Sequence, residues 1–328
     1  MSTVRLGVLG CADVAVRRVL PALARTDAAG LTAVASRDAE RAAEIAGRFG
    51  GEPVTGYGEL LARPDVDAVY VPLPTGLHAE WVRAALEQGK HVLAEKPLTT
   101  TETQTRELFE LAESRGLVLR ENYMFPWHSQ HDAVRKQVAD GAIGQLRSIR
   151  ATFTVPRRRD DDIRHDAALG GGSLLDNGGY PVRVARMFLG DDLTVAGASL
   201  YRPAGAEVDH GGSAVLRRAD GATAVLTFGM DHAYEASYTL HGSTGVLTLE
   251  RAYAPPEDHR PVLRVRRQQH SEDHTLPADD QFAASVREFA RAVDSARRAG
   301  RDEAAAAAAA GAIAQARLID GIRRCSRQ

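Results

Sequence analysis

The sequence predicts an α/β Rossmann domain, with a parallel sheet and helices on both faces, followed by an α+β domain with a large, mostly antiparallel, open-faced sheet. Three observations support this fold class. The 328 residues exceed what one hydrophobic core usually serves. Short apolar runs alternate with amphipathic stretches as far as residue 122. After that point the rhythm changes, and residues 193–266 are mostly β-prone, so we place the domains at residues 1–122 and 123–328.

In the first domain we expect five clear strands, at residues 4–9, 31–35, 68–71, 91–94 and 117–120, and a short one near Val54. The apolar positions between them recur at three and four, which predicts helices at residues 15–24, 39–49, 78–88 and 101–115. Thr101 is typical of a helix N-cap, and Gly116 of a helix end.

In the second domain we expect helices at residues 131–139 and 174–188, a long strand at 146–155, and several strands from 193 to 266. Residues 242–245 read Gly-Ser-Thr-Gly, which predicts a tight hairpin turn. Two closing helices are predicted at residues 281–299 and 303–324.

The composition of the chain argues against nucleic acids and membranes as its partners. The formal net charge is −2 and no long basic run occurs, which argues against a nucleic-acid surface. No apolar run approaches the roughly 20 residues that span a bilayer, and no signal peptide is visible. The two cysteines, Cys11 and Cys325, lie at opposite ends and fit a reducing compartment. We therefore expect a cytoplasmic protein with a small-molecule substrate.

The first strand leads into a dinucleotide-binding fingerprint with alanine at two of its small positions. Its residues are Gly10, Cys11, Ala12, Asp13 and Val14, followed by a helix. Small residues let the backbone approach a pyrophosphate, and the helix N-terminus offers N–H groups to it. The alternative is a βα turn without a ligand. Cys11 is either a reactive thiol or, as we prefer, a small residue that fills the loop.

The end of the second strand favours NADP over NAD. An NAD enzyme places a carboxylate there to bind the ribose, whereas this chain has Ser36 and Arg37. A hydroxyl and a guanidinium suit a 2′-phosphate, and Arg41, one turn later, is expected to assist. The alternative for both arginines is a solvated position at the start of a helix.

Two further strand ends carry candidate cofactor-binding residues. The third clear strand is followed by Pro72, Leu73 and Pro74, with His78 on the next helix; the fourth is followed by Glu95, Lys96 and Pro97. The carboxyl ends of strands are where an open α/β sheet binds its ligands.

These motifs together resemble the Gfo/Idh/MocA family of oxidoreductases. The resemblance rests on the fingerprint at residues 10–15, Pro72-Leu73-Pro74 with His78, Glu95-Lys96-Pro97, and residues 171–176 with Tyr180-Pro181, in the same order. It covers nearly the whole chain. It implies a homo-oligomer, a dimer or tetramer, and the open face of the C-terminal sheet would carry the contact.

Within the family, the chain is similar to NADP-dependent sugar 3-ketoreductases of deoxysugar and antibiotic biosynthesis. Three features carry this similarity: Cys11-Ala12-Asp13, residues 121–125 with 128–131, and Tyr180 where sugar dehydrogenases usually have histidine. It implies NADPH-dependent reduction of a keto group, at C3, on a dTDP-linked keto-deoxyhexose. The acidic run 160–162 and the pair Asn177 and Gly178 depart from the pattern of these enzymes.

Ketone reduction needs a donor for the carbonyl oxygen, which gains negative charge as hydride arrives. Lys96 and Tyr180 are the candidate catalytic residues, and the sequence leaves open which of them delivers the proton. Asp176, one turn before Tyr180, is expected to orient a sugar hydroxyl or Lys96. The alternatives are a surface lysine, a core tyrosine and a solvated helix carboxylate.

Phe125, His128, Gln130 and Arg164 are the candidate substrate contacts, together with Asp176 and Tyr180. Arg164 and the run 157–159 could bind a diphosphate by forked hydrogen bonds, although such charge runs are commonly solvated. His128 and His131 have the spacing of a metal pair, but no third ligand is evident in the sequence, so we predict no metal.

Two other functions stay open. One is NADP-dependent oxidation of an aldose or a diol of the xylose or dihydrodiol type. The other is a non-catalytic NADP-binding protein, which the presence of Lys96, Asp176 and Tyr180 disfavours.

Overall fold

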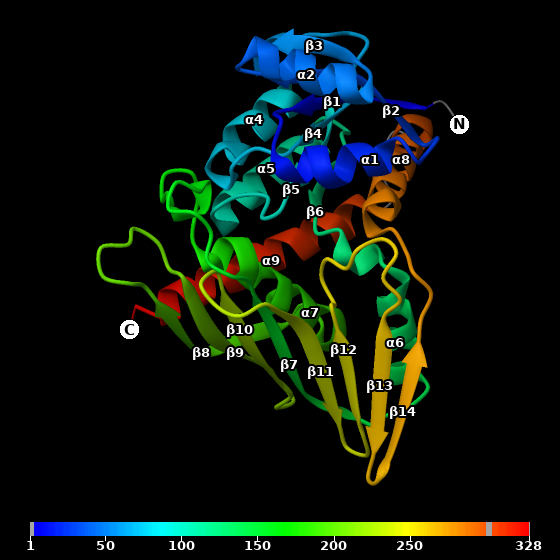
Figure 1. Cartoon of the computed structure of the whole chain (residues 1–328), viewed down its shortest axis with the longest axis vertical. Helices are drawn as coiled ribbons and strands as arrows, with labels where there is room; N and C mark the ends of the chain where they lie inside the picture. The colour runs from blue at the N-terminus through cyan, green and yellow to red at the C-terminus, as the bar shows by residue number, and fades with distance from the viewer. Residues whose placement is uncertain (1–2, 300–303, 328) are drawn as a thin grey trace. The chain divides into compact units, whose positions relative to one another are not determined.

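A computed structural model describes residues 3–299 and 304–327 and divides the chain into two compact units (Figure 1). The N-terminal unit comprises Met1–Met124 with Phe282–Ile313, and the C-terminal unit comprises Phe125–Gln281 with Ala314–Gln328. Residues 282–313, which the sequence analysis placed in the second domain, thus belong to the N-terminal unit by their contacts. That residues 1–122 bind the cofactor and residues 123–328 bind the substrate remains a prediction.

The N-terminal unit is built on a six-stranded parallel sheet in the order β3-β2-β1-β4-β5-β6. Its strands are β1 (Val4–Leu9), β2 (Ala29–Ser36), β3 (Glu52–Thr55), β4 (Ala68–Val71), β5 (His91–Glu95) and β6 (Leu119–Asn122). All four residues of β4 and all five of β5 are buried, as expected of central parallel strands. The predicted Rossmann fold is confirmed.

Helices of the N-terminal unit pack on this sheet. They are η1 (Ala15–Val19), α1 (Leu20–Leu23), α2 (Ala39–Phe49), α3 (Tyr57–Leu61), α4 (Thr75–Glu87), α5 (Glu102–Ser114) and α8 (Gln281–Ala299). Thr101 caps α5 as predicted, because its side chain accepts a hydrogen bond from Gln104 N. The sequence analysis missed α3, which is too short to show a helical period.

The C-terminal unit contains an eight-stranded mixed sheet in the order β14-β13-β12-β11-β7-β10-β9-β8. The strands are β7 (Leu146–Thr154), β8 (Leu193–Tyr201), β9 (Gly211–Arg218), β10 (Thr223–Gly229), β11 (Glu235–Gly242), β12 (Val246–Glu250), β13 (Val262–Arg267) and β14 (His270–Thr275). Neighbouring strands are antiparallel except for β7 and β10. Gly242 N donates to Gly245 O at 2.8 Å, which closes the predicted turn between β11 and β12.

One face of this sheet is covered and the other is open. In β11, Ala236, Tyr238 and Leu240 are buried, whereas the alternate residues are partly exposed. The remaining helices of this unit are η2 (Phe125–Trp127), α6 (Ser129–Ala139), η3 (Ile163–His165), η4 (Leu174–Gly178) and α7 (Gly179–Leu189). η4 and α7 pack on β7 and β10. The predicted α+β architecture with an open-faced sheet is confirmed.

The last helix, α9 (Ala305–Cys325), begins in the N-terminal unit and ends in the C-terminal unit. The predicted helix at residues 303–324 agrees with it, except that Glu303 lies outside the described residues. The sequence analysis placed β6 two residues too early. It also missed β14, which lies at the edge of the sheet and consists of polar residues.

Candidate functional site

The carboxyl ends of four parallel strands bring the predicted cofactor residues to one edge of the N-terminal sheet. Gly10 follows β1, Ser36 ends β2, Pro72 follows β4, and Lys96 follows β5. β1 and β4 are neighbours although β2 follows β1 in the chain, so the strand order reverses direction between them. An open α/β sheet binds its ligand at such a position.

Gly10, which has no side chain, leaves its main chain accessible to a ligand. Its φ is +109°, and a Cβ there would lie 2.8 Å from Leu73 Cδ2 and 3.7 Å from the Tyr57 hydroxyl oxygen. Only glycine meets both conditions without strain. The loop therefore fits a dinucleotide, because a pyrophosphate must come close to the main chain here.

Cys11, directly after Gly10, is partly buried, which favours its interpretation as a residue that fills the loop. Burial raises the pKa of the Cys11 thiol above its usual value, although the charge of Arg41 lowers it. Its sulfur lies 3.9 Å from Arg41 O. A thiol with a raised pKa is protonated at neutral pH and is a poor nucleophile. Asp13, two residues on, is exposed and pairs with Arg17 at 3.2 Å.

The end of β2 presents a cation and a hydroxyl. Ser36 is buried, and its Oγ accepts a hydrogen bond from Asp38 N at 3.1 Å. Asp38 is the N-cap of α2 and accepts from Glu40 N and Arg41 N. Its carboxylate is thus engaged with the helix terminus. Arg37 is exposed at this position, whereas the guanidinium of Arg41 pairs with Glu44 at 2.6 Å.

Tyr57, at the start of α3, belongs to the same region and was missed by the sequence analysis. Its ring meets the ring of Trp81 edge-on at 5.0 Å between centroids, and its hydroxyl oxygen lies 3.7 Å from the position that a Cβ on Gly10 would occupy. No sequence motif marks this tyrosine, because it lies 20 residues after Arg37 in the chain.

His78 is fully buried and connects two strand ends. Its Nε2 lies 2.7 Å from Leu73 O, and its Nδ1 lies 3.0 Å from Pro97 O. Burial lowers the pKa of His78, and a neutral ring has one N–H, so it donates to one of these two carbonyls at a time. The structure therefore gives His78 a role in holding the loops after β4 and β5 together; contact with the cofactor remains a prediction.

Glu95 is also turned inward. Its Oε1 accepts hydrogen bonds from the Tyr70 hydroxyl at 2.8 Å and from Asn122 Nδ2 at 2.7 Å, and burial raises its pKa. Asn122 Oδ1 in turn accepts from Ser285 of α8 at 2.7 Å. Lys96 is the half-buried residue after this strand and precedes a cis peptide bond to Pro97.

In the C-terminal unit, the predicted catalytic Tyr180 belongs to an aromatic cluster. Its ring centroid lies 4.7 Å from that of Phe153, 5.5 Å from that of Tyr253 and 5.7 Å from that of Phe125. Phe125 is fully buried, and Tyr180 is 5% exposed. The cluster fixes the plane of the Tyr180 ring, which is a requirement for a precisely placed phenol.

Asp176, one turn before Tyr180, accepts a hydrogen bond from Arg164 Nε at 2.7 Å. Arg164 also pairs with Asp162 at 3.0 Å, and the two carboxylates raise its pKa above the usual range despite burial. Asp176 lies in η4, which is a π-helix. π-Helical turns often occur at functional sites, and η1 after the fingerprint is another. The structure thus brings together two residues that the sequence could only name separately.

The start of η4 is anchored by Asp209, which the sequence analysis did not identify. Asp209 Oδ2 accepts from Leu174 N at 2.7 Å. Two glycines before η4 leave no room for a side chain. A Cβ on Gly171 would lie 2.5 Å from the main-chain Arg164 O, and one on Gly172, whose φ is +106°, would lie 2.6 Å from the side-chain Asp209 Oδ1. This packing places the Arg164 segment against the start of the helix.

His128, Gln130 and His131 are fully buried, and each has a structural contact. His128 Nδ1 accepts from Gln130 N at 3.1 Å, as the N-cap of α6. Gln130 Nε2 donates to Ala252 O at 3.2 Å, and His131 bridges Tyr238 and Ala252 at 2.9 and 3.0 Å. Substrate contact by His128 and Gln130 stays a prediction. Among the described residues, no group of three His, Cys, Asp or Glu side chains could hold a metal.

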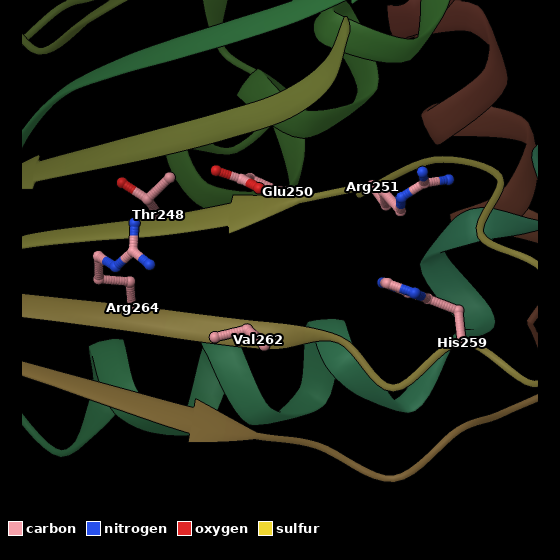
Figure 2. A pocket seen from close by; sticks show the side chains of 6 residues that line it. All are labelled: Thr248, Glu250, Arg251, His259, Val262 and Arg264. Atoms are coloured by element: carbon pink, nitrogen blue, oxygen red, sulfur yellow. The ribbon is translucent and has the colours of Figure 1, made fainter.

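A hollow elsewhere on the C-terminal unit contains none of the predicted residues. Figure 2 shows it beside β12 and β13. Its lining residues are Thr248, Glu250, Arg251, His259, Val262 and Arg264. Thr248, Glu250, Val262 and Arg264 come from strand positions on the open face of the sheet, so the hollow is a feature of that face.

Comparison with known proteins agrees with this geometry. A family model described as "Oxidoreductase family, NAD-binding Rossmann fold" matches residues 4–123, and the "GFO/IDH/MocA C-terminal domain" model matches residues 131–248. A dTDP-3,4-didehydro-2,6-dideoxy-α-D-glucose 3-reductase from Streptomyces violaceoruber is 52% identical over 325 residues, which are 98% of this chain and 95% of the relative. The chain belongs to the Gfo/Idh/MocA family.

The chain is also similar to two other proteins of known name. The crystal structure of KijD10, a 3-ketoreductase from Actinomadura kijaniata, in complex with NADP and TDP-benzene superimposes with a TM-score of 0.95. It is 49% identical, and the match covers 99% of this chain and 98% of that one. A D-xylose 1-dehydrogenase (NADP(+)) from Haloferax volcanii is 37% identical over 88% of each chain.

The Gfo/Idh/MocA chain meets the structural requirements of a dinucleotide site in its own residues: a bare glycine turn after β1, and a hydroxyl with an exposed arginine at the end of β2. No helix among residues 3–299 and 304–327 combines the length and apolar character needed to cross a membrane.

Proposed function

We propose that this Gfo/Idh/MocA chain uses NADPH to reduce the C3 keto group of dTDP-3,4-didehydro-2,6-dideoxy-α-D-glucose, in deoxysugar and antibiotic biosynthesis. The observation that carries the proposal is the 52% identity, over nearly the full length, to a reductase of that name. KijD10, of the same fold over 99% of this chain, was crystallised with NADP and TDP-benzene. The shared length includes both units, which favours a shared nucleotide-sugar substrate.

The residues at the end of β2 support NADP as the cofactor. Arg37 is exposed there and Ser36 is the neighbouring hydroxyl, whereas an NAD site would present a carboxylate at this strand end. Asp38 is drawn to the N–H groups of α2, so its carboxylate caps the helix. A 2′-phosphate would meet the guanidinium of Arg37 by charge-assisted hydrogen bonds.

NADPH, when bound, supplies the hydride for the carbonyl carbon. The carbonyl oxygen then gains negative charge, and one proton must reach it. Lys96 and Tyr180 are the proposed residues for these tasks: the ammonium stabilises the oxygen, and the phenol or the ammonium delivers the proton. The aromatic cluster around Tyr180 holds its ring in one orientation.

Asp176 and Arg164 are the proposed polar contacts for the sugar and its diphosphate. The ion pair between them holds the carboxylate of Asp176 in one orientation, and a carboxylate can accept a hydrogen bond from a sugar hydroxyl. Phe125 would contribute an apolar wall. His128 and Gln130 would act through the position of α6, which their hydrogen bonds maintain.

The test follows NADPH absorbance with enzymatically generated dTDP-3,4-didehydro-2,6-dideoxyglucose, with NADH in parallel. We expect NADPH consumption, a loss of at least a thousandfold in kcat for Lys96→Met, and about a hundredfold for Tyr180→Phe. Two matched controls are Lys136→Met, an exposed lysine paired with Asp140, and Tyr201→Phe, a tyrosine that is 60% exposed. Absence of turnover in wild type, or full activity of Lys96→Met, contradicts the proposal.

The 37% identity to an NADP-dependent D-xylose dehydrogenase favours one second candidate, oxidation of a free aldose or diol. The same assay decides between the two, with NADP⁺ and free xylose as the alternative substrates. Reduction of NADP⁺ by xylose, without activity on the diketo sugar, assigns the chain to the dehydrogenases. NADPH binding without turnover of either substrate assigns it a non-catalytic role.

We also propose that the chain forms a cytoplasmic homo-oligomer through the open face of its C-terminal sheet. Val225 on β10 is 42% exposed and Val262 on β13 is 40% exposed, although both occupy strand positions. A second copy would cover these side chains. Light scattering coupled to size exclusion should give a dimer or tetramer, and Val225→Asp should lower the mass towards that of one chain. A wild-type protein that is monomeric would contradict the proposed homo-oligomer.

A further inference from the structure

Lys96 lies one residue beyond the last strand pair of β5. Side chains of neighbouring elements contact the main chain that follows it. Pro97 O lies 3.0 Å from His78 Nδ1 of α4. Leu98 N donates a hydrogen bond to Glu121 Oε1 of β6 at 3.0 Å. The main chain that carries the proposed catalytic lysine therefore depends on side-chain contacts in addition to the sheet.

The carboxylate of Glu95 holds the other side of this segment. Its Oε2 accepts a hydrogen bond from Lys96 N at 3.3 Å. Its Oε1 accepts from the Tyr70 hydroxyl of β4 at 2.8 Å and from Asn122 Nδ2 of β6 at 2.7 Å. Glu95 is 6% exposed, and a buried carboxylate requires donors of this kind. One carboxylate thus connects two neighbouring strands to the main chain of the lysine.

Asn122 is held in turn by helix α8. Its Oδ1 accepts a hydrogen bond from Ser285 Oγ at 2.7 Å, although 163 positions separate the two residues in the chain. The two side chains are 2% and 4% exposed. Because the hydroxyl donates to the oxygen of the amide, the donor end, Nδ2, faces Glu95. An amide turned by half a revolution would place its oxygen against the carboxylate and lose this hydrogen bond.

We propose that Asn122 and Ser285 are positioning residues for Lys96, which act through the carboxylate of Glu95. The inference rests on the proposed function, because it requires Lys96 to act on the carbonyl oxygen. A lysine has a flexible four-carbon stem, so its ammonium is placed precisely only when the main chain below it is fixed. Without the amide donor, the carboxylate loses one of the hydrogen bonds that aim it at Lys96 N.

The test measures kcat and KM for NADPH-dependent reduction of the diketo sugar by two variants. Ser285→Ala removes the hydroxyl, and Asn122→Leu replaces the amide by an apolar side chain of similar size. We expect kcat to fall about fivefold in Ser285→Ala and at least about tenfold in Asn122→Leu, with the KM for the sugar within about twofold. Ser285→Thr keeps the hydroxyl and should recover most of the loss.

The matched control is Lys90→Met, at the opposite end of β5. Lys90 Nζ donates to Arg63 O at 2.6 Å and to Val66 O at 2.8 Å, so this variant also loses hydrogen bonds of a buried side chain. Denaturant unfolding should show a loss of stability, whereas kcat should equal that of wild type. Calorimetric titration of NADPH supplies a readout without turnover, and we expect its affinity for Ser285→Ala to stay within about threefold of wild type.

Combination with Lys96→Met separates positioning from an independent effect. If the two residues act through Lys96, adding Asn122→Leu to Lys96→Met changes the residual rate by less than about twofold. An unchanged kcat in Asn122→Leu, additive losses in the double variant, an equal loss of kcat in Lys90→Met, or a loss of NADPH affinity in Ser285→Ala as large as its loss of kcat each overturn the inference, while wild type stays active and Lys96→Met inactive. An inactive wild type or a fully active Lys96→Met overturns the proposed function and this inference together.

Discussion

The guanidinium of Arg164 donates a hydrogen bond from Nε to Oδ2 of Asp176 at 2.7 Å, and this contact joins the loop at residues 162–172 to η4, which leads directly into α7 with Tyr180. The side chains are 31% and 20% exposed, so water screens the pair only in part. A carboxylate held in this way has one oxygen fixed and presents the other in a defined direction. We regard the pair as one functional group.

Arg164→Ala should lower kcat/KM for the nucleotide sugar by about tenfold or more, because Asp176 loses its orientation. Arg164→Lys should restore little of this loss, since an ammonium lacks the forked geometry. Steady-state kinetics with the diketo sugar and a separate NADPH titration check this expectation. Arg159→Ala, three residues before this loop and with a side chain that is 88% exposed, is the control. Equal kinetics for the variants at 159 and 164 would show that the pair is only structural.

Gly171→Ala should disturb the same loop through its backbone. The new Cβ would lie 2.5 Å from Arg164 O and 2.7 Å from Asp166 O, and neither main-chain atom can move without shifting the segment. We expect a stability loss of about 1–3 kcal/mol and weaker substrate binding. Chemical denaturation and the KM for the sugar measure the two effects. Gly197→Ala, which meets nothing within 4 Å, is the matched glycine control in the same unit. An unchanged KM in Gly171→Ala would contradict the expected link.

His131 should make stability depend on pH between neutrality and mild acid. Burial lowers the pKa of His131 to about 3 from an ordinary 6.5. Since Ala252 O can only accept, Nε2 carries the proton and Nδ1 accepts from Tyr238. A group whose folded pKa is lowered this way contributes stability above pH 6.5, and the contribution is lost as the pH falls, because the unfolded chain takes up the proton first.

The size of this effect is measurable by denaturant unfolding from about pH 8 to about pH 5, where His131 should cost the folded state about 2 kcal/mol. His131→Gln should remove that part of the pH dependence, while lowering stability at pH 8 by about 1–3 kcal/mol through the lost hydrogen bonds. His270→Gln, at an exposed histidine that pairs with Glu272, should leave the profile unchanged. Parallel profiles for wild type and His131→Gln would rule out this assignment.

Asp67 should anchor α8 to the N-terminal sheet. It pairs with Arg5 of β1 at 2.6 Å and with Arg297 of α8 at 2.8 Å. Burial raises the pKa of Asp67, but hydrogen bonds from Arg5 and Arg297 outweigh it and hold the pKa well below the usual range. This carboxylate thus stabilises the fold above its unfolded pKa of 3.8, and the contribution fades as the pH falls further.

Asp67→Asn should lower the free energy of unfolding at neutral pH by about 1 kcal/mol, a figure reduced for the exposure of both arginines. The difference from wild type should shrink in acid, where Asp67 of the unfolded chain is protonated. Asp65→Asn, at the neighbouring carboxylate paired with Arg63, should have a smaller effect, because that pair does not reach α8. Equal destabilisation by the two variants would mean that the contact with α8 contributes nothing.

The elements that the sequence predicted well are those with a local signal. β1, β4, α2 and α8 have the predicted bounds, and Thr101 caps α5 as expected. Apolar period and capping are properties of residues within a few positions of each other, so one sequence is enough. The elements that the sequence analysis missed have weak local signals. α3 is a single short helix, and β14, at the edge of its sheet, consists of polar residues and shows no alternation of apolar and polar positions.

The sequence by itself determined the fold class and the strand ends that carry Gly10, Arg37 and Lys96, because the order of elements and the periods of 2 and 3.6 decide these. The motifs at these strand ends indicated the family by resemblance. Only the tertiary structure decided which side chains face a ligand and which face the core. His78 and Glu95 follow strand ends as predicted, yet both turn inward to protein partners. The start of α3 is joined to the end of β2 by the hydrogen bond from Gly56 N to Ser36 O, across 20 residues of chain. Such contacts depend on the direction and burial of side chains. These are determined when segments distant in the sequence pack together, so a local sequence pattern does not predict them.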